Sequence, residues 1–348
     1  MKVSLIIVCH HSSEVLPACV ESFRRQAANV GGAEVVAVDH SEDPEEARRI
    51  ASADVDVVIE RTNRGYAAGL NAGMAAASGD VLLLANPDIR FFDGSLGALL
   101  GGLEAGFDIV GPQFVWDADA TVLLPPAEDP APVSELGRSL QRRWRWLWSS
   151  GLQRRLQGTL QAWTANSVLP AASLRGALMA LRREVADRYG PFDEGYFLYH
   201  EETEWLWRAR GQGARLGLVA PAKVQHQWGH ATRLVDGIVE REAGSRERFY
   251  HRNHPAIWRW LLRLSADRGQ TPTLPVRQIA ETGEIPETEA DLWLASPFSH
   301  LMPALGCIRT TGFPRAFLEF CRDQRWFVTA AKSENGRWRL LDPLGREQ

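Results

Sequence analysis

Short apolar segments alternate regularly with amphipathic helical segments through the first 115 residues. Because a strand buried on both faces is apolar along most of its length, these segments are typical of strands in a parallel sheet. Their alternation with helices predicts an α/β fold with a doubly wound, mostly parallel sheet and helices on both faces. The expected strands are Val3–Cys9, Glu34–Asp39, Val55–Ile59, Val81–Ala85 and Asp108–Val115.

The stretch from Asn63 to Asp88 joins a turn and helix of small residues to a wholly apolar strand and ends on Asn-Pro-Asp. A carboxylate just past the carboxyl end of a buried strand faces the crevice in which open α/β sheets bind ligands. A divalent ion that bridges substrate phosphates needs only one or two protein carboxylates. Asn-Pro-Asp is by itself a common turn sequence, but its placement here makes Asp88 a candidate for a metal or diphosphate site.

Other residues in this part of the chain suit a nucleotide. Asp39 ends the second expected strand, where a carboxylate can accept hydrogen bonds from a base or ribose, although such an acid is more often a turn residue. Asn63-Arg-Gly-Tyr and Gly69-Leu-Asn-Ala-Gly are small enough for the backbone to approach a diphosphate. They match neither the P-loop nor the GxGxxG pattern, and by themselves their glycines indicate turns and packing.

Acids at the start of a later helix and one histidine are the remaining candidates. His200-Glu-Glu-Thr-Glu204 opens a helix, and acids in a first turn stabilise the helix dipole by about 0.3–1 kcal/mol, which favours a structural role. Glu204 is spaced to pair with an arginine four residues later, which leaves Glu201 and Glu202 as candidates for a general base. His226 lies in a strand-like segment, where it is either a metal ligand or, more often, a core histidine.

The composition is that of an ordinary globular protein. The chain has 348 residues and a net charge of −4, which argues against a general nucleic-acid binder. Its four cysteines form no CxxC or Cys/His cluster, so we expect buried free thiols, a reducing compartment and no zinc site. The first residues predict a strand rather than a signal peptide, and no apolar segment has the length of a membrane span. We therefore expect a cytoplasmic protein.

A basic, Trp-rich insertion interrupts the alternation between residues 116 and 166. Across residues 138–156, leucines and tryptophans fall on one helical face, arginines lie mostly off it, and no acid occurs between Leu136 and Ala162. Such a helix suits a membrane surface with anionic lipids. It equally suits a helix that packs its apolar stripe on the domain and leaves its arginines in water. Gly151 and the two serines before it predict an interruption of the helix.

The C-terminal part has a pattern of its own. Residues 266–289 are polar and contain proline, which is typical of a linker. A helix at residues 314–323 and two strands joined through Glu334-Asn-Gly follow, and Asn-Gly between strands is a strong hairpin signal. The sequence therefore predicts a domain at residues 1–265, a linker, and a small α+β appendage at residues 290–348 that carries no evident chemistry.

Six segments in a fixed order resemble family 2 glycosyltransferases, most closely the bacterial rhamnosyltransferase-like branch. They are VSLIIVCH, VVAVDHSED, NRGYAAGLNAG…GDVLLLANPD, GALMALRR, GPFDEGYFLYHEETEWLWRARGQG and VAPAKVQHQWGHAT. The resemblance covers roughly residues 3–260 and leaves the C-terminal appendage outside. It implies a GT-A fold, a nucleotide-diphosphate-sugar donor, a Mg²⁺ or Mn²⁺ ion, and an inverting single displacement.

The resemblance also implies roles for individual residues. Asp39 would contact the base, and Asp88 would be the remaining acid of a DxD-like motif with Asn86 in its first position. Glu202 takes the place of the family's catalytic aspartate, and Glu201 precedes it. The nucleotide-sugar cleft would be lined by Asn63, Gly65, Gly69 and Asn71, and the acceptor side would be bordered by Gly176 and Ala177.

The sequence departs from the family's pattern at several of these positions. Cys9-His10 replaces a usual Thr-Tyr or Thr-Asn pair, and His40 replaces the asparagine after the strand-end acid. Glu202 is one methylene longer than aspartate, which leaves open which glutamate is the base. Asn86 removes one charge from the metal site, so metal dependence has to be tested.

The function that follows is transfer of a hexose, such as rhamnose, to a hydroxyl of a glycan, lipid-linked or small-molecule acceptor in cell-surface polysaccharide biosynthesis. Glu202 would be the base, and Asp88, helped by His226, would hold the metal. Docking of residues 138–156 on the inner face of the cell membrane fits a lipid-linked acceptor. The alternatives are a non-catalytic sugar-nucleotide-binding protein and a sugar nucleotidyltransferase. The latter needs a Gly-rich, basic loop after the first strand, which HHSSEVLP does not supply.

Overall fold

The computed structural model describes residues 1–28, 30–143, 145–226, 237–265, 277–279, 290–296, 304–310, 326–334 and 337–341. The chain divides into two compact units. Unit 1 comprises Met1–Gln113, Ala127–Pro130 and Ala165–Arg259, and unit 2 comprises Phe114–Pro126, Ala131–Thr164 and Trp260–Gln348. All the candidate site residues named from the sequence lie in unit 1.

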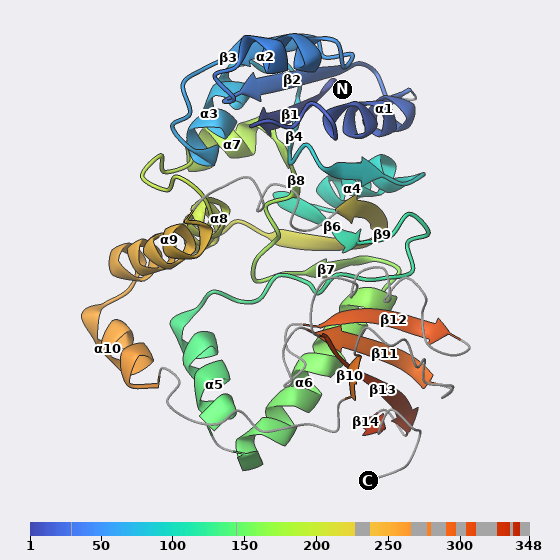
Figure 1. The fold of residues 1–348 in the computed structure, drawn as a ribbon, viewed down its shortest axis with the longest axis vertical. Helices are drawn as coiled ribbons and strands as arrows, with labels where there is room; N and C mark the ends of the chain where they lie inside the picture. Colours follow the sequence, from blue (N-terminus) through green and yellow to red (C-terminus); the bar gives the residue numbers. More distant parts are fainter. Residues whose placement is uncertain are drawn as a thin grey trace. The chain divides into compact units, whose positions relative to one another are not determined.

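The first part of unit 1 alternates strand and helix, as the sequence predicts (Figure 1). Four parallel strands lie in the order β3-β2-β1-β4. β1 and β4 are buried at every position, which explains their apolar sequences. The elements are β1 (Val3–Cys9), α1 (Leu16–Ala27), β2 (Ala33–Asp39), α2 (Pro44–Ala51), β3 (Val57–Glu60), α3 (Tyr66–Ala76) and β4 (Val81–Ala85).

Helices cover both faces of this sheet. Successive side chains of a strand point to opposite faces. Val8 points toward α3, since a Cβ added at Gly69 would lie 2.6 Å from its side chain. Its neighbour Cys9 points to the other face, toward Cys19 of α1. The expected α/β fold is therefore confirmed.

The thiols of Cys9, Cys19 and Cys307 are buried and free, as expected. Cys321 lies outside the described residues.

An antiparallel extension completes the sheet. β8 (Leu178–Arg182) pairs antiparallel with β4 and with β6 (Ile109–Val115), so a later strand inserts between two earlier ones. The full order is β3-β2-β1-β4-β8-β6-β9-β5, with β7 paired to β9. The remaining elements up to residue 265 outside the insertion are β5 (Ile89–Phe91), α4 (Ser95–Glu104), β7 (Val168–Pro170), α7 (Arg183–Tyr189), α8 (Glu201–Gly211), β9 (Leu216–His226), α9 (Ile238–Asn253) and α10 (Ala256–Ser265).

The helix α8 is anchored in the core of unit 1 by Trp205. This side chain is fully buried and stacks on Phe192 with ring centroids 4.9 Å apart. Its indole Nε1 donates a hydrogen bond of 2.8 Å to the carbonyl of Gly190. A buried aromatic pair with a satisfied polar group packs rigidly, so the first residues of α8 are held in a defined place.

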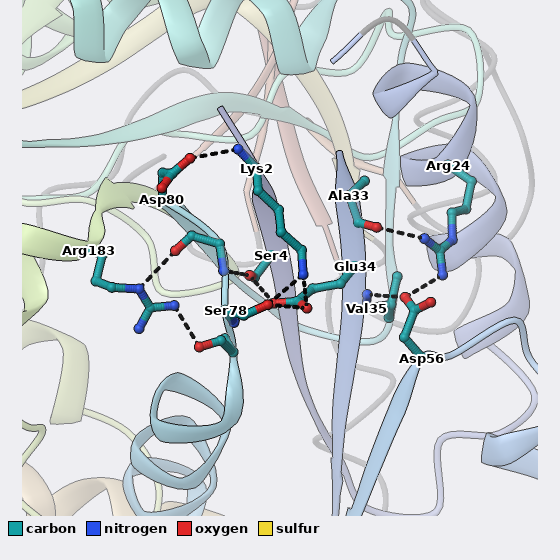
Figure 2. Close-up of polar contacts among 12 residues, drawn as sticks. Lys2, Ser4, Arg24, Ala33, Glu34, Val35, Asp56, Ser78, Asp80 and Arg183 are labelled. Atoms are coloured by element: carbon teal, nitrogen blue, oxygen red, sulfur yellow. Dashed lines mark hydrogen bonds and ion pairs between the residues drawn. The ribbon is translucent and has the colours of Figure 1, made fainter. Parts of the chain in front are cut away.

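A polar network fastens the amino ends of the strands, at the edge opposite their carboxyl ends (Figure 2). The carboxylate of Glu34 accepts hydrogen bonds from Lys2 Nζ at 2.6 Å, from Ser4 Oγ at 2.5 Å and from Ser78 Oγ at 2.7 Å. Arg183 Nε donates to the carbonyl of Gly79 at 2.8 Å. Burial by itself would raise the pKa of Glu34, but the hydrogen bonds from Lys2, Ser4 and Ser78 lower it to about 2.

Unit 2 contains a separate antiparallel sheet. Its order is β10-β13-β11-β12, with β14 paired to β13, as the predicted hairpin requires. The two residues at the bend of this hairpin, the expected helix at residues 314–323 and most of the expected linker lie outside the described residues. The elements of unit 2 are α5 (Pro132–Arg143), α6 (Arg145–Thr164), β10 (Arg277–Ile279), β11 (Ala290–Ser296), β12 (Leu305–Thr310), β13 (Trp326–Glu334) and β14 (Arg337–Leu341).

Most of the insertion groups with the C-terminal strands in unit 2, whereas the sequence pattern predicts it as part of a domain at residues 1–265. Trp163 of α6 packs on Gly306 of β12, where an added Cβ would lie 2.0 Å from the indole ring. The same indole donates a hydrogen bond of 3.0 Å to the carbonyl of Leu124. Residues far apart in the chain thus share one core, which a reading along the sequence does not reveal.

The helix of the insertion also differs from its expected form. α6 continues from Arg145 to Thr164 without a break at Gly151, because a single glycine costs only about 1 kcal/mol in a helix, and packing can offset this cost. Leu156 is buried in unit 2, so the end of the apolar stripe packs inward. The structure does not describe the side chains of residues 141–150, which include the tryptophans of this segment. No described helix is both long and apolar enough to cross a membrane.

Candidate active site

Asp88 and His226 come together at the carboxyl edge of the sheet. Asp88 follows β4 and directly precedes β5, and the antiparallel pairing of β5 with β9 sets Ile89 opposite His226. His226 Nε2 lies 3.4 Å from Asp88 Oδ1, and both residues are buried. Among the described residues, Asp88 Oδ1 has no hydrogen-bond partner. The two candidate metal ligands are therefore neighbours.

The surroundings of Asp88 fit a divalent cation. A buried carboxylate oxygen without a partner is costly unless a cation or a donor compensates its charge. Within the described part of the chain, no group of three or more His, Cys, Asp or Glu side chains is placed to hold a metal by itself. An ion held by Asp88 and His226 would therefore take its remaining ligands from substrate phosphates and water, as Mg²⁺ commonly does.

The glutamate pair begins α8 after two residues with left-handed backbone. Tyr199 and His200 have φ values of 65° and 64°, a conformation that costs non-glycine residues roughly 1–3 kcal/mol and clusters at functional sites. Glu201 is buried, and Glu202 is partly buried. Gly176 provides the room for Glu202, because a Cβ at this position would lie 2.9 Å from Glu202 Cγ. The acceptor-side glycine and the candidate base are thus in contact.

The two glutamates differ in their electrostatic surroundings. Burial, together with the neighbouring charge of Glu202, raises the pKa of Glu201 well above its ordinary value. Burial also raises the pKa of Glu202, but the backbone N–H groups at the start of α8, the Thr203 hydroxyl and the Arg175 guanidinium act in the opposite direction. The pKa of Glu201 is thus raised more strongly, which favours the proton of the pair on Glu201 and ionisation of Glu202.

Tyr66 is hydrogen-bonded to Asn86 and lies within electrostatic reach of the glutamate pair, and it was not among the residues predicted from the sequence. Its hydroxyl donates a hydrogen bond of 2.8 Å to Asn86 Oδ1, and the backbone N–H of Asn86 donates to the carbonyl of Ala177 at 2.9 Å. Burial and the nearby charges of Glu201, Glu202 and Asp88 raise the pKa of Tyr66. The only sequence signal was an aromatic side chain within a run of small residues.

In the turn before α3, both the backbone conformation and the close packing require a glycine at Gly65. Its φ is +96°, and a Cβ would lie 2.4 Å from the carbonyl oxygen of Phe197. The side chain of Asn63 accepts a hydrogen bond of 3.0 Å from the Gly65 N–H, and Tyr66 N–H donates to the carbonyl of Phe197 at 2.8 Å. The turn before α3 thus touches the segment that leads into α8.

Asp39, Gly69 and Asn71 have structural contacts. Asp39 is buried, and its Oδ1 accepts a hydrogen bond of 2.9 Å from the N–H of Ser41. Gly69 packs on Val8. Asn71 exchanges two hydrogen bonds with the backbone of Phe192, at 3.0 and 2.9 Å. Asn71 therefore holds the segment before α8, and a contact of these three residues with a nucleotide sugar stays a prediction.

An α/β sheet that gathers carboxylates beyond the carboxyl ends of its strands is typical of enzymes that bind phosphorylated ligands. Residues 4–169, just under half of the chain, match the family described as Glycosyl transferase family 2. The match includes every donor-side candidate from Asp39 to Asp88. Gly176, Ala177, the glutamate pair and His226 lie beyond its end.

Known proteins resemble the chain at a distance. The Low-salt glycan biosynthesis hexosyltransferase Agl10 of Haloferax volcanii is 24% identical over 218 residues, which is 61% of this chain and 63% of the relative. The match thus spans less than two thirds of that relative. The structure of the mannosyltransferase PcManGT of Pyrobaculum calidifontis, in complex with GDP-Man and Mn²⁺, is 17% identical in sequence and superposes with a TM-score of 0.47. This match covers 76% of the present chain and 68% of the mannosyltransferase chain. TarS residues 1–349 of S. aureus are 13% identical at a TM-score of 0.43, with 73% of each chain covered.

Proposed function

We propose that the protein is an inverting glycosyltransferase with a GT-A fold that transfers a hexose, such as rhamnose, from a nucleotide-diphosphate sugar to an acceptor hydroxyl. The observation that carries this proposal is the linkage of two groups. Asp88 is a buried carboxylate suited to a metal–diphosphate complex, and Asn86, two residues before it, donates its backbone N–H to the carbonyl of Ala177. The neighbouring Gly176 lies against Glu202, a carboxylate suited to a base. The family 2 match and the distant hexosyltransferase support the same reading.

Glu202 acts as the general base in the proposed reaction. Its carboxylate takes the proton of the acceptor hydroxyl as that oxygen forms a bond to the anomeric carbon. The bond between the anomeric carbon and the diphosphate oxygen breaks, and the nucleoside diphosphate leaves with the bonding electron pair. A single displacement from the face opposite the leaving group inverts the anomeric configuration. Glu201 keeps its proton and stays neutral beside the base.

Asp88, helped by His226, would hold a Mg²⁺ or Mn²⁺ ion. Such an ion supplies positive charge that stabilises the leaving diphosphate. Asp39 would contact the base of the nucleotide, and the turn at Asn63 and Gly65 would line the cleft, together with Gly69 and Asn71. Gly176 and Ala177 would border the acceptor.

The acceptor is proposed to be a hydroxyl of a glycan or lipid-linked sugar in cell-surface polysaccharide biosynthesis, at the cytoplasmic face of the membrane. The basic segment at residues 138–156 supports docking on anionic lipids. Replacement of Trp144, Trp146 and Trp148 by serine is expected to abolish binding to vesicles that contain phosphatidylglycerol. Equal binding by this variant would contradict the docking proposal.

The second candidate is a protein that binds a sugar nucleotide without turning it over. Donor turnover distinguishes the two. A panel of nucleotide sugars is incubated with acceptor extracts, with and without EDTA, and released nucleoside diphosphate is measured. We expect Glu202→Gln and Asp88→Ala to lose roughly 10²–10⁴-fold in turnover, and EDTA to abolish it. Asp93→Ala, which removes an exposed carboxylate of the same unit, is the matched control.

Unchanged turnover in both site variants would refute the site assignment. Donor binding without any turnover by the wild type would favour the binding protein. A sugar nucleotidyltransferase would instead form a sugar nucleotide from a sugar phosphate and a nucleoside triphosphate, and it would release pyrophosphate.

A further inference from the structure

Tyr66 and Asn86 share a hydrogen bond that the proposed mechanism does not use. The phenol oxygen lies 2.8 Å from Asn86 Oδ1. The backbone of Asn86 is fixed on both sides, because its N–H donates to the Ala177 carbonyl at 2.9 Å and its carbonyl faces Cys19 Sγ at 3.8 Å. The side chain of Asn86 is therefore held in one place, two residues before Asp88.

The direction of this hydrogen bond decides which end of the amide faces outward. A tyrosine hydroxyl is protonated at neutral pH, so it donates, and the amide oxygen accepts. The reverse orientation would leave the phenol proton without an acceptor among the described residues. With the oxygen engaged, the Nδ2 group is the end that remains, and within the described ranges it donates to no residue.

We propose that Asn86 binds a diphosphate oxygen of the donor substrate through Nδ2, as a hydrogen-bond donor and not as a metal ligand, and that Tyr66 is the positioning residue that orients it. The inference rests on the proposed function. An amide N–H that donates to an anionic oxygen makes a charge-assisted hydrogen bond. Asp88 is then left as the carboxylate of this motif that approaches the metal.

The surrounding charges explain why an amide suits this position. Burial and the nearby acids, among them Glu202 and Asp88, raise the pKa of Tyr66, so carboxylate charge already lies close to the phenol. A further carboxylate at position 86 would add like-charge repulsion and would face the anionic diphosphate. Asparagine keeps the acceptor for Tyr66 and offers a donor to the substrate.

The test is a double-mutant cycle on donor kinetics with the full chain. Tyr66→Phe and Asn86→Ala are each expected to raise the KM for the donor by roughly 10- to 100-fold, with a smaller change in kcat. The combined variant should be no worse than Asn86→Ala alone, because Tyr66 acts through Asn86. Tyr196→Phe is the matched control, since its buried hydroxyl has no hydrogen-bond partner among the described residues.

Two further measurements separate a hydrogen-bond donor from a metal ligand. The Mn²⁺ concentration for half-maximal turnover should be unchanged in Asn86→Ala, and Asn86→Asp should raise the KM for the donor. The rise in unfolding temperature that UDP or GDP with MnCl₂ gives the wild type should shrink in Tyr66→Phe and in Asn86→Ala. This last readout needs no turnover.

The outcomes distinguish this inference from the function on which it rests. Additive effects in the cycle, or a lower Mn²⁺ requirement in Asn86→Asp, would overturn the role of Asn86 while leaving a glycosyltransferase in place. A wild type that turns over no donor and is not stabilised by either nucleotide would overturn both.

Discussion

At the residue scale, the chemistry of the site depends on which of two neighbouring glutamates is ionised. Glu201 and Glu202 are adjacent in sequence, yet the Thr203 hydroxyl and the Arg175 guanidinium favour the ionised form of Glu202, whereas the charge of Glu202 favours the protonated form of Glu201. Two like acids whose surroundings separate their pKa values commonly have different roles. The protonated residue would then be a neutral neighbour, and the ionised residue is the proposed base.

The raised pKa of Glu201 predicts a pH-dependent stability. A group whose pKa is higher in the folded than in the unfolded protein stabilises the fold fully below the unfolded value, and this contribution is lost as the pH rises. Glu201→Gln mimics the protonated form and lacks this loss. Thermal unfolding should therefore show no difference between Glu201→Gln and the wild type near pH 4, and a more stable variant at pH 7–8. Equal unfolding temperatures at pH 8 would contradict the assignment.

Gly176 predicts a loss of activity without a loss of fold. An alanine methyl at this position would meet Glu202 Cγ at 2.9 Å and displace the carboxylate. A misplacement of about 1 Å costs roughly 10²-fold in rate, so we expect kcat of Gly176→Ala to fall by about this factor while the unfolding temperature changes by only a few degrees. Gly97→Ala, on the exposed side of α4 with nothing within 4 Å of its Cβ, is the control. A variant of Gly176 with normal kcat would show that this glycine does not position Glu202.

At the scale of elements, the sheet separates stability from chemistry. The network around Glu34 fastens the amino ends of β1 and β2, while Asp39 is the last residue of β2 and Asp88 lies beyond the carboxyl end of β4. In parallel strands these are opposite edges of the sheet, and ligands bind at the carboxyl edge. Changes at the amino edge should therefore alter stability and leave donor binding unchanged.

The low pKa of Glu34 gives a test of this separation. A carboxylate whose pKa is depressed in the folded state contributes stability above its unfolded value, near 4.5, and loses it as the pH falls toward about 2. Glu34→Gln should lower the free energy of unfolding by roughly 1–3 kcal/mol at pH 7, and the difference should shrink below pH 4.5. Chemical denaturation across this pH range measures it, and the KM for the donor should equal that of the wild type. A KM that changes would contradict the separation.

At the scale of the whole molecule, two compact units share one chain that passes between them several times. Unit 1 holds every candidate site residue. Unit 2 combines most of the insertion with the C-terminal sheet, where Trp163 occupies the space that the missing side chain of Gly306 leaves. A unit with its own hydrophobic core can gain or lose stability without a change in the chemistry of the other unit.

Gly306→Ala tests this independence. The added methyl would lie 2.0 Å from the indole of Trp163, and such overpacking costs roughly 1–3 kcal/mol. We expect calorimetry to show an unfolding transition that moves to lower temperature. The donor KM, measured below that transition, should stay within about twofold of the wild type. A large change in this KM would show that unit 2 contributes to donor binding.

Local sequence patterns are sufficient to predict the α/β class, the strands β1 to β4 and the placement of Asp88 beyond a buried strand. These follow from local periodicity and from the few residues that suit a buried strand or a tight turn. The two candidate metal ligands and the glutamate pair were also found, because carboxylates and histidines at element ends are visible in any sequence.

Which of these residues contact one another depends on the folded chain. The insertion of β8 between β4 and β6, the contact of Gly176 with Glu202, and the hydrogen bond between Tyr66 and Asn86 all join segments that are distant in the chain. Such pairings depend on strand order and close packing, which leave no periodic trace in the sequence. For the same reason, the joining of the insertion with the C-terminal strands in unit 2 was visible only after folding.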